Sequence, residues 1–489
     1  MSVTATPAAD RAAAAATHAA VFTGAAAFAG GAASAAGTAG TAGFALRPAT
    51  SSADPRGCPV GTSSQAAIDH LEQAMWRLVS YFGDPLADLD AAIAEDPAWL
   101  LPYLVKANAL LTMAEHRFNR MAEESVAQGL AANTGRGMLE REAAHLAATR
   151  AGLAGQWRTA CDLWDAILVD HPQDLAALLP AHLFDFYRGD SLNLRRRVAR
   201  VLPDWSPAAP LYSYVLGQYA FGLEECNLYP QALEAGQRAL ALDRRDPWAV
   251  HAVAHVHEML GEYDEGARWL ASREQDWSPD NGFAFHNWWH LALFHVEKLD
   301  TDAALRIFDE HVAPGAEMAL QQVDAAALLW RLTLMEVDVG ERWARLAPAW
   351  PAAAPDGGFY SFNDLHAVLT HVGAGHIGAA QSMLDVAVAG AGAATTCGAA
   401  AADTGVPLMR SVIAMAQGRD AEAVDGLMAV RETAHRFGGS HAQRDLIDQT
   451  LLAAAIRAGR RPLARHLLNE RMMAKSESPL TGFWKRRVG

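Results

Sequence analysis

The sequence predicts an all-α protein in which antiparallel helix pairs stack into a solenoid. Past Pro59, apolar residues recur at helical spacing between short turns along most of the 489-residue chain. Sustained alternating runs and hairpin turns between β-branched segments, which would indicate strands, are nearly absent. Tyr229 and Tyr263 also open similar segments 34 positions apart, and a period of this length is typical of helical repeat arrays.

The clearest copy of the repeat begins at Gly155 and closes at Pro172. Trp157 follows the glycine at the turn, Ala160 is small enough to let two helices approach closely, and Trp164 can fill the gap between repeats. This order of small, aromatic, small and aromatic residues is the tetratricopeptide pattern. The sequence therefore predicts a tetratricopeptide-like α-solenoid that winds as a right-handed superhelix.

The same repeat pattern recurs along the chain and predicts a series of helix pairs. In each pair the first helix is expected to line the concave face of the superhelix and the second to cover its convex back. The predicted pairs, with boundaries uncertain by about two to four residues, are 66–96, 98–132, 138–170, 174–201, 209–243, 246–272, 283–312, 319–350, 360–388, 405–434 and 440–472.

Regions outside the pairs have a different composition. Residues 1–60 are low in complexity and rich in Ala and Gly, so we expect a flexible arm. Residues 61–475 form the repeat array, and residues 476–489 form a C-terminal tail that caps it. The Ala/Gly-rich run from 387 to 404 is expected to be a flexible insertion between two late repeats.

Composition excludes several classes of protein. The chain has 40 Lys and Arg against 55 Asp and Glu, a formal charge of −15, and no basic block that would embrace a phosphate backbone. With 51% hydrophobic residues it cannot be wholly disordered. The uncharged stretch 21–46 has too few Leu, Ile and Val for a spanning helix. We therefore expect neither a nucleic acid nor a membrane as partner.

Cysteine usage indicates a reducing compartment. The four cysteines are far apart and form no C-x-x-C pair or regular framework. Such a distribution is typical of free thiols in a cytoplasmic protein rather than of a disulfide scaffold. The sequence leaves the oligomeric state open.

Two histidine pairs occur on consecutive first helices. His251 and His255 share a helix face with Glu258, and His286 shares a face with His290 on the next first helix. Neighbouring helices pack about 8–10 Å apart, so the pairs should converge across the concave side. The register is ambiguous, because the pairs are 35 positions apart by sequence and nearer 38 when aligned by the following turns.

Three interpretations of these residues remain open at the sequence level. His251, His255, His286 and His290 could hold a divalent transition metal such as Zn, Fe or Mn. Alternatively, His255, Glu258 and His290 could act as acid–base catalysts without a metal, although no H-E-x-x-H motif supports a metalloprotease. The third interpretation is structural packing between repeats.

Other polar and aromatic residues fall on first helices that should face the concave side. Each alone is explained by solvation, capping or core packing. Together they would line a groove suited to a peptide or a small polar ligand. With the histidines, the expected ligand-binding residues are His251, His286, Asn287, Trp288, Asp324, Arg331, Asn363, Asp364, His366, His441 and Arg444.

Several strings resemble the tetratricopeptide repeat protein 38 family. The most specific are H-N-W-W-H at 286–290 and G-G-S-H-A-Q-R-D at 438–445, and the similarity runs from about residue 56 to 475. The resemblance implies a helical repeat fold. It implies little about activity, because that family is known mainly by its repeats, and no catalytic residue can be carried over.

Two functions therefore compete. The first is a repeat protein whose concave groove, lined by His, Asp, Glu and Arg, binds a peptide or small polar ligand. The alternative is an enzyme with a metal-dependent or histidine acid–base site within the same groove.

Overall fold

A computed structural model describes residues 46–47, 52–314, 316–351, 357–475 and 478–489. Within these ranges the chain is all-α, and the β contacts are isolated bridges rather than strands. None of the helices in the described ranges has both the length and the apolar character that crossing a membrane requires. The predicted α-solenoid of tetratricopeptide type is confirmed.

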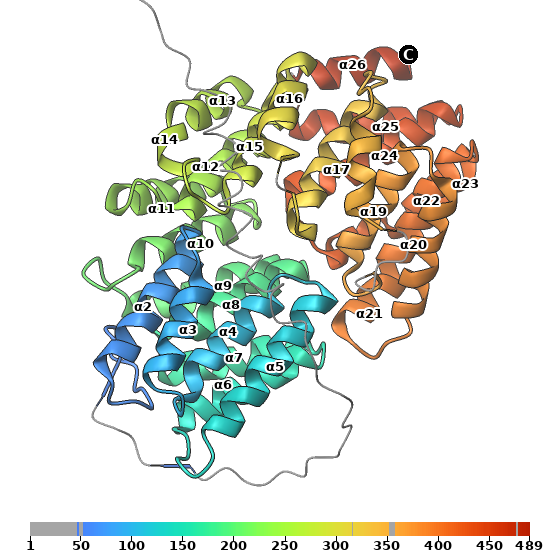
Figure 1. Cartoon of the computed structure of the whole chain (residues 1–489). Helices are drawn as coiled ribbons and strands as arrows, with labels where there is room; N and C mark the ends of the chain where they lie inside the picture. Colours follow the sequence, from blue (N-terminus) through green and yellow to red (C-terminus); the bar gives the residue numbers. More distant parts are fainter. Residues whose placement is uncertain (1–45, 48–51, 315, 352–356, 476–477) are drawn as a thin grey trace, which may run out of the picture.

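The first six helix pairs occupy the predicted positions (Figure 1). Members of a pair pack antiparallel and connect through short turns. These pairs are α2 (Gln65–Ser80) with α3 (Pro85–Glu95), α4 (Leu100–Leu111) with α5 (His116–Ala132), α6 (Glu140–Leu153) with α7 (Trp157–Asp170), α8 (Leu175–Tyr187) with α9 (Ser191–Val201), α10 (Tyr212–Glu224) with α11 (Tyr229–Leu242), and α12 (Pro247–Leu260) with α13 (Tyr263–Ser272).

The later pairs are less regular, because several second helices end in 3-10 or π turns. A short helix, α14 (Glu274–Trp277), is inserted before them. They are α15 (Ala284–Glu297) with α16 (Thr301–Ile307), α17 (Ala319–Leu334) with α18 (Arg342–Leu346), α19 (Ser361–Gly373) with α20 (Ile377–Gly390), α22 (Val406–Ala416) with α23 (Asp420–Val430), and α24 (His441–Arg457) with α25 (Arg461–Ala474).

Local sequence explains where many helices begin. Asp174 and Asp246 accept hydrogen bonds from backbone N–H groups in the first turns of α8 and α12. Ser440 and Gln443 form a capping box at α24. Between repeats, Gly266 lets α13 lie against Phe294 of α15, because a Cβ there would stand 2.2 Å from the ring. Small residues at such positions set the close helix spacing.

The expectation of a flexible insertion at 387–404 is wrong. α20 continues to Gly390, and α21 (Thr396–Ala400) then leads through a π turn into α22. The backbone N–H of Thr396 donates to the carbonyl of Gly155 over 2.9 Å, so this segment packs on the turn between α6 and α7. Alanine and glycine are used here for close packing rather than for mobility.

The predicted arm and tail are partly described. Most of the arm, residues 1–45 and 48–51, lies outside the described residues. Its last part packs on the solenoid, since Arg56 bonds Glu72 of α2 and Cys58 is buried. The tail contains α26 (Pro479–Val488), whose Leu480 and Trp484 are buried beside α25 and α15.

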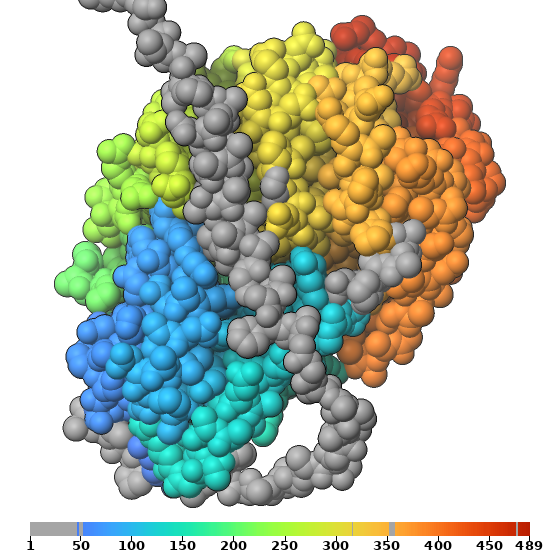
Figure 2. Space-filling model, viewed as in Figure 1, coloured from blue at the N-terminus to red at the C-terminus, as the bar shows by residue number. Residues whose placement is uncertain are grey.

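The solenoid closes on itself, so that segments far apart in sequence lie side by side (Figure 1). The Trp248 indole of α12 donates to the carbonyl of Val79 on α2 over 2.8 Å. On the opposite side, Arg444 of α24 lies 3.1 Å from Glu225 after α10. In Figure 2 the cyan segment at the start of α5 lies next to the yellow segment that leads into α17, where the backbone N–H of Ala319 donates to Oε1 of Glu115 over 3.1 Å. The concave side therefore encloses a cavity rather than an open groove.

Candidate functional site

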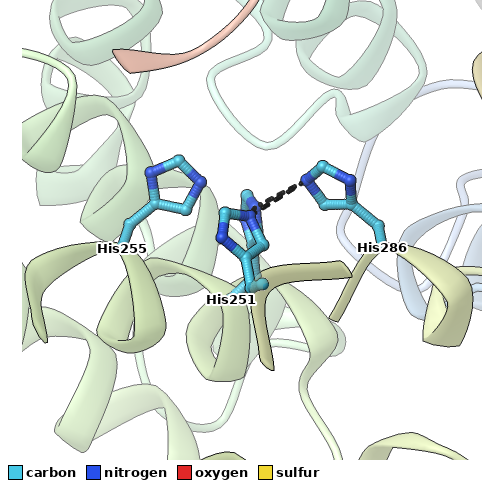
Figure 3. A group of neighbouring side chains, drawn as sticks. His251, His255 and His286 are labelled. Atoms are coloured by element: carbon cyan, nitrogen blue, oxygen red, sulfur yellow. Dashed lines mark hydrogen bonds between the residues drawn. The ribbon is translucent and has the colours of Figure 1, made fainter. Parts of the chain in front are cut away.

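The two histidine pairs converge on one point inside the closed solenoid. His251 and His255 lie one turn apart on α12, and His286 and His290 do the same on α15. All four side chains are buried, with between 0% and 8% of their surface exposed. Figure 3 shows the rings of His251, His255 and His286 side by side at one level. The predicted convergence is thus confirmed despite the ambiguous register.

Three ring nitrogens form a nearly equilateral triangle. The Nε2 atom of His251 lies 3.1 Å from Nε2 of His286 and 3.2 Å from Nε2 of His290. The Nε2 atoms of His286 and His290 lie 3.2 Å apart. Imidazole nitrogens bind Zn at about 2.0–2.1 Å, so an ion at that distance from all three nitrogens fits on one side of the triangle. His255 offers a further nitrogen, and ligand atoms of all four histidines lie within 4.8 Å of one another.

The outer nitrogens of three rings face carboxylates. Nδ1 of His286 lies 2.6 Å from Oδ2 of Asp324, and Nδ1 of His290 lies 3.1 Å from Oε2 of Glu258. Nδ1 of His255 lies 3.2 Å from Oε2 of Glu224. Metal-binding histidines usually donate their other N–H to such a group, which fixes the tautomer.

The carboxylates outside the triangle determine which of the inner Nε2 atoms can carry a proton. When Nδ1 of His286 and His290 donates a proton to Asp324 and Glu258, Nε2 of each ring carries a lone pair that points inward. His251, whose Nδ1 has no hydrogen-bond partner, can bring at most one proton to the triangle. One proton cannot satisfy three mutual contacts, whereas a cation at the centre satisfies all three.

Burial also favours neutral rings. Desolvation and the neighbouring histidines hold the pKa of His251 and His290 well below its usual range. Desolvation lowers the pKa of His255 to about 4. The imidazoles of His251, His255 and His290 are therefore neutral near pH 7, which is the form that binds metals. Burial together with Glu225 raises the pKa of Glu224 well above its usual range, so a neutral carboxyl lies beside His255.

A second group of predicted site residues supports the cluster from behind. Their link to the cluster is Trp289, a residue that the sequence analysis did not single out. Its indole stacks on the His286 ring with centroids 5.3 Å apart. The guanidinium of Arg331 lies over that indole at 5.4 Å and donates to the carbonyl of Ala442 over 2.6 Å. Asn287 is fully buried, and its amide finds no hydrogen-bond partner among the described residues. Arg331 ties α17 to α24 beside the cluster, and neither it nor Asn287 is among the described residues that line the adjoining cavity.

The other predicted ligand-binding residues are placed elsewhere. Asn363, Asp364 and His366 bond backbone groups of Ala114, Gly358 and Phe362, respectively, and none of the three lines the cavity. They stabilise the start of α19, and Asn363 also joins it to the turn after α4. His441 and Arg444 both reach Glu225, so they join α24 to α10 behind His255.

A cavity of about 980 Å³ opens beside the histidine cluster, and His251 and His286 form part of its wall. Phe283 packs against both rings, with centroids 5.1 Å from His251 and 5.0 Å from His286. Tyr81 and Trp248 stack next to it. Trp288 also lines the cavity and stacks on His311. Sequence reasoning missed Tyr81, Trp248 and Phe283, because α2 meets α12 and α15 only when the solenoid closes.

No family model matches the chain. Its fold is similar to a tetratricopeptide repeat protein from Parabacteroides merdae at 13% identity, covering 61% of this chain and 100% of that one with a TM-score of 0.32. It is also similar to a chain of the Cut9–Hcn1 hetero-tetramer of the APC/C, at 12% identity over 86% of this chain and 76% of that one, with a TM-score of 0.41.

Human IFIT1, solved as a dimer with m7Gppp-AAAA, matches at 12% identity over 86% of this chain and 94% of that one, with a TM-score of 0.40. At this level the likeness concerns helical repeats and says nothing of a shared ligand. The repeated helix pairs themselves are seen in the structure. Membership of the tetratricopeptide repeat protein 38 family stays a prediction, as does the absence of a nucleic-acid partner.

Proposed function

We propose that the protein binds one divalent transition metal through Nε2 of His251, His286 and His290 and uses it on a small organic ligand in the adjoining cavity. The observation that carries this proposal is the triangle of three nitrogens at 3.1–3.2 Å, two of them on rings whose Nδ1 faces a buried carboxylate. Zn, Fe and Mn all accept imidazole ligands.

The proposal redistributes the roles expected from sequence. His290 becomes a metal ligand rather than an acid–base catalyst, and Glu258 orients it. His255 lies at the edge of the triangle beside the neutral carboxyl of Glu224. It is therefore placed either to complete the ligand set or to exchange a proton with a ligand. When bound in such a site, a metal acts as a Lewis acid and can activate water.

The enclosed site favours a small molecule over a peptide. An extended peptide needs a groove that is open along several repeats, whereas the histidines here are buried under α2, α10 and α24. A cavity of about 980 Å³ lies at the upper end of the range for small-molecule sites. This observation favours a small ligand over a peptide, which were both open in the first expectation, and it is equally compatible with the enzyme alternative.

Metal analysis of the purified chain tests the proposal. We expect about one Zn, Fe or Mn per chain after reconstitution, and less than about 0.1 in a His286→Ala/His290→Ala variant. His257 and His295 lie on the same two helices but pair with Glu262 and Asp300 outside the cluster. The matched control, His257→Ala/His295→Ala, should therefore retain the metal.

Two results would overturn the proposal. One is a folded wild-type chain that stays metal-free after exposure to each of the three ions. The other is equal loss of metal in the two double variants, because that would place the metal outside the triangle.

A further inference from the structure

The walls of the cavity are dominated by aromatic and aliphatic side chains. Aromatic side chains in the wall include those of Tyr81, Phe186, Phe221, Trp248 and Phe283. Methionines from α2, the turn after α4 and the position before α17 lie among them. Such walls reward the burial of apolar surface at roughly 25 cal/mol per Å². Flexible methionines also adapt to ligands of different shape. The bulk of the occupant must therefore be apolar.

Charge around the cavity disfavours an anion. Among the described lining residues, Arg77 is the one Arg or Lys, and its guanidinium is paired with Asp88. The lining also includes Asp280, Glu310 and Glu317, which are exposed acidic residues. A negatively charged ligand would meet these carboxylates on entry and find no cation dedicated to it.

The proposed metal does not reverse this preference. Its double positive charge is partly offset by Asp324 and Glu258, which are both buried within one imidazole of the nitrogen triangle, although Glu258 also lies 3.7 Å from Nζ of Lys475. A ligand therefore meets a reduced positive charge at the centre. A neutral oxygen or nitrogen atom of the ligand can complete the coordination.

One wall of the cavity offers a polar contact. Asn108 of α4 is 4% exposed and lines the cavity, and within the described part of the chain neither its amide nitrogen nor its amide oxygen has a hydrogen-bond partner. A buried amide without partners is unfavourable, because its lost contacts with water are not replaced. It becomes favourable when a ligand supplies a matching donor and acceptor, such as an amide or a hydroxyl group.

We propose that the cavity binds an uncharged, largely apolar and aromatic small molecule, whose neutral polar group pairs with Asn108 or faces the histidine centre. This proposal deepens the proposed function and rests on it for the role of the metal. It excludes carboxylates and phosphates as preferred ligands of the site.

Competition against the neutral fluorescent probe Nile red tests the charge preference. The two competitors, 2-naphthamide and 2-naphthoate, have nearly the same shape but differ in charge at pH 7. Nile red should bind the metal-loaded chain, and the amide should displace it at a concentration at least about tenfold lower than the carboxylate. Equal displacement, or better displacement by the carboxylate, would overturn the proposal, as would failure of Nile red to bind.

Two variants locate the binding. Asn108→Leu keeps the side-chain size but removes the amide, so 2-naphthamide should bind about fivefold more weakly while Nile red binds as before. Ala109→Phe, also in the cavity wall, should weaken Nile red binding about tenfold. The exposed control Ala131→Phe on α5 should not. An Asn108→Leu variant with unchanged amide affinity would contradict the role of Asn108.

Metal content, measured on the same samples, separates the two proposals. A chain that binds metal but discriminates against neither competitor overturns the ligand class and leaves the metal centre standing. A metal-free chain that still prefers 2-naphthamide supports the ligand class and overturns the proposed function.

Discussion

At the scale of single residues, the carboxylates behind the histidines determine what the centre can do. Asp324 and Glu258 are buried, and each faces the outer nitrogen of one ring. Without them, His286 and His290 could carry the proton on either nitrogen and rotate. With them, both rings present a lone pair to the same point. Two charged groups that stand outside the triangle therefore define its chemistry.

Replacing Asp324 by Asn tests this role. The amide can still accept one hydrogen bond, but it loses the charge that favours the metal-binding tautomer of His286. We expect the dissociation constant for Zn to rise about 10–100-fold, as measured by competition with a chelator. The melting temperature of the metal-free protein should change little. The exposed Asp302→Asn is the matched control, and unchanged Zn affinity in Asp324→Asn would show that Asp324 does not orient the ring.

The sequence predicted part of this centre. The i,i+4 spacing of His251 with His255 and of His286 with His290 was sufficient to place each pair on one helix face. The contact between His286 and Asp324 could not be predicted from helical spacing, because it joins residues 38 positions apart on different repeats. Asp324 was expected to line the groove, and the structure places its carboxylate 2.6 Å from Nδ1 of His286, the ring nitrogen outside the triangle.

At the scale of helices, the array is joined by buried polar contacts as well as by apolar packing. Asp174 caps α8 and also contacts Arg141 and His145 of α6, at 2.6 and 2.9 Å. Burial alone would raise the pKa of Asp174, but Arg141 and His145 more than offset it and hold the pKa well below its usual range. One carboxylate thus stabilises two consecutive first helices.

This contact predicts a pH dependence of stability. A carboxyl whose pKa is depressed by folding stabilises the protein above its unfolded pKa of about 3.9, and the effect is lost as pH falls toward the folded value. Asp174→Asn should therefore lower the free energy of unfolding by about 3–5 kcal/mol at pH 7. That difference from wild type should stay constant down to about pH 5 and shrink below pH 4.

Denaturant titrations at several pH values measure this difference. The exposed Asp170→Asn at the end of α7 is the control and should behave as wild type throughout. A deficit in Asp174→Asn that is independent of pH down to pH 3 would mean that the charge of Asp174 is not what stabilises the pair.

Helix positions were the most predictable level of the structure. Helices leave local signals in the sequence: apolar residues at helical spacing, small residues at turns, and capping residues such as Ser440. The helix pairs predicted from these signals agree with the helices of the structure. The prediction of a flexible insertion at 387–404 failed because a run of Ala and Gly is compatible with two kinds of structure. They are typical of flexible linkers, but they also allow the close approach that Thr396 makes to Gly155.

At the scale of the whole molecule, closure of the solenoid creates the site. The end of α2 approaches α12 and the segment before α15 from one side, and α24 approaches α10, α12 and α17 from the other. An open solenoid with the same helices would expose the histidines in a groove, as the sequence suggested. Closure depends on contacts between residues more than 150 positions apart, such as Trp248 and Val79. Local sequence patterns do not predict such contacts.

Arg444→Ala tests whether closure couples distant repeats. The variant leaves Glu225 buried without its guanidinium partner, which should cost about 2–3 kcal/mol. If α24 holds the ring closed, hydrogen exchange should become faster in α10 and α12 as well as in α24. The control Arg419→Ala removes an exposed pair with Glu422 inside α23 and should change little. Faster exchange confined to α24 would contradict closure as the source of the buried site.

The central claim is that three Nε2 atoms hold a metal inside this closed solenoid. Anomalous diffraction from crystals grown with Zn, recorded on both sides of the absorption edge, tests it most directly. The account predicts one dominant peak about 2.0–2.2 Å from Nε2 of His251, His286 and His290. Zn peaks only at surface histidines, with the three imidazoles bonded to one another or to water, would contradict it.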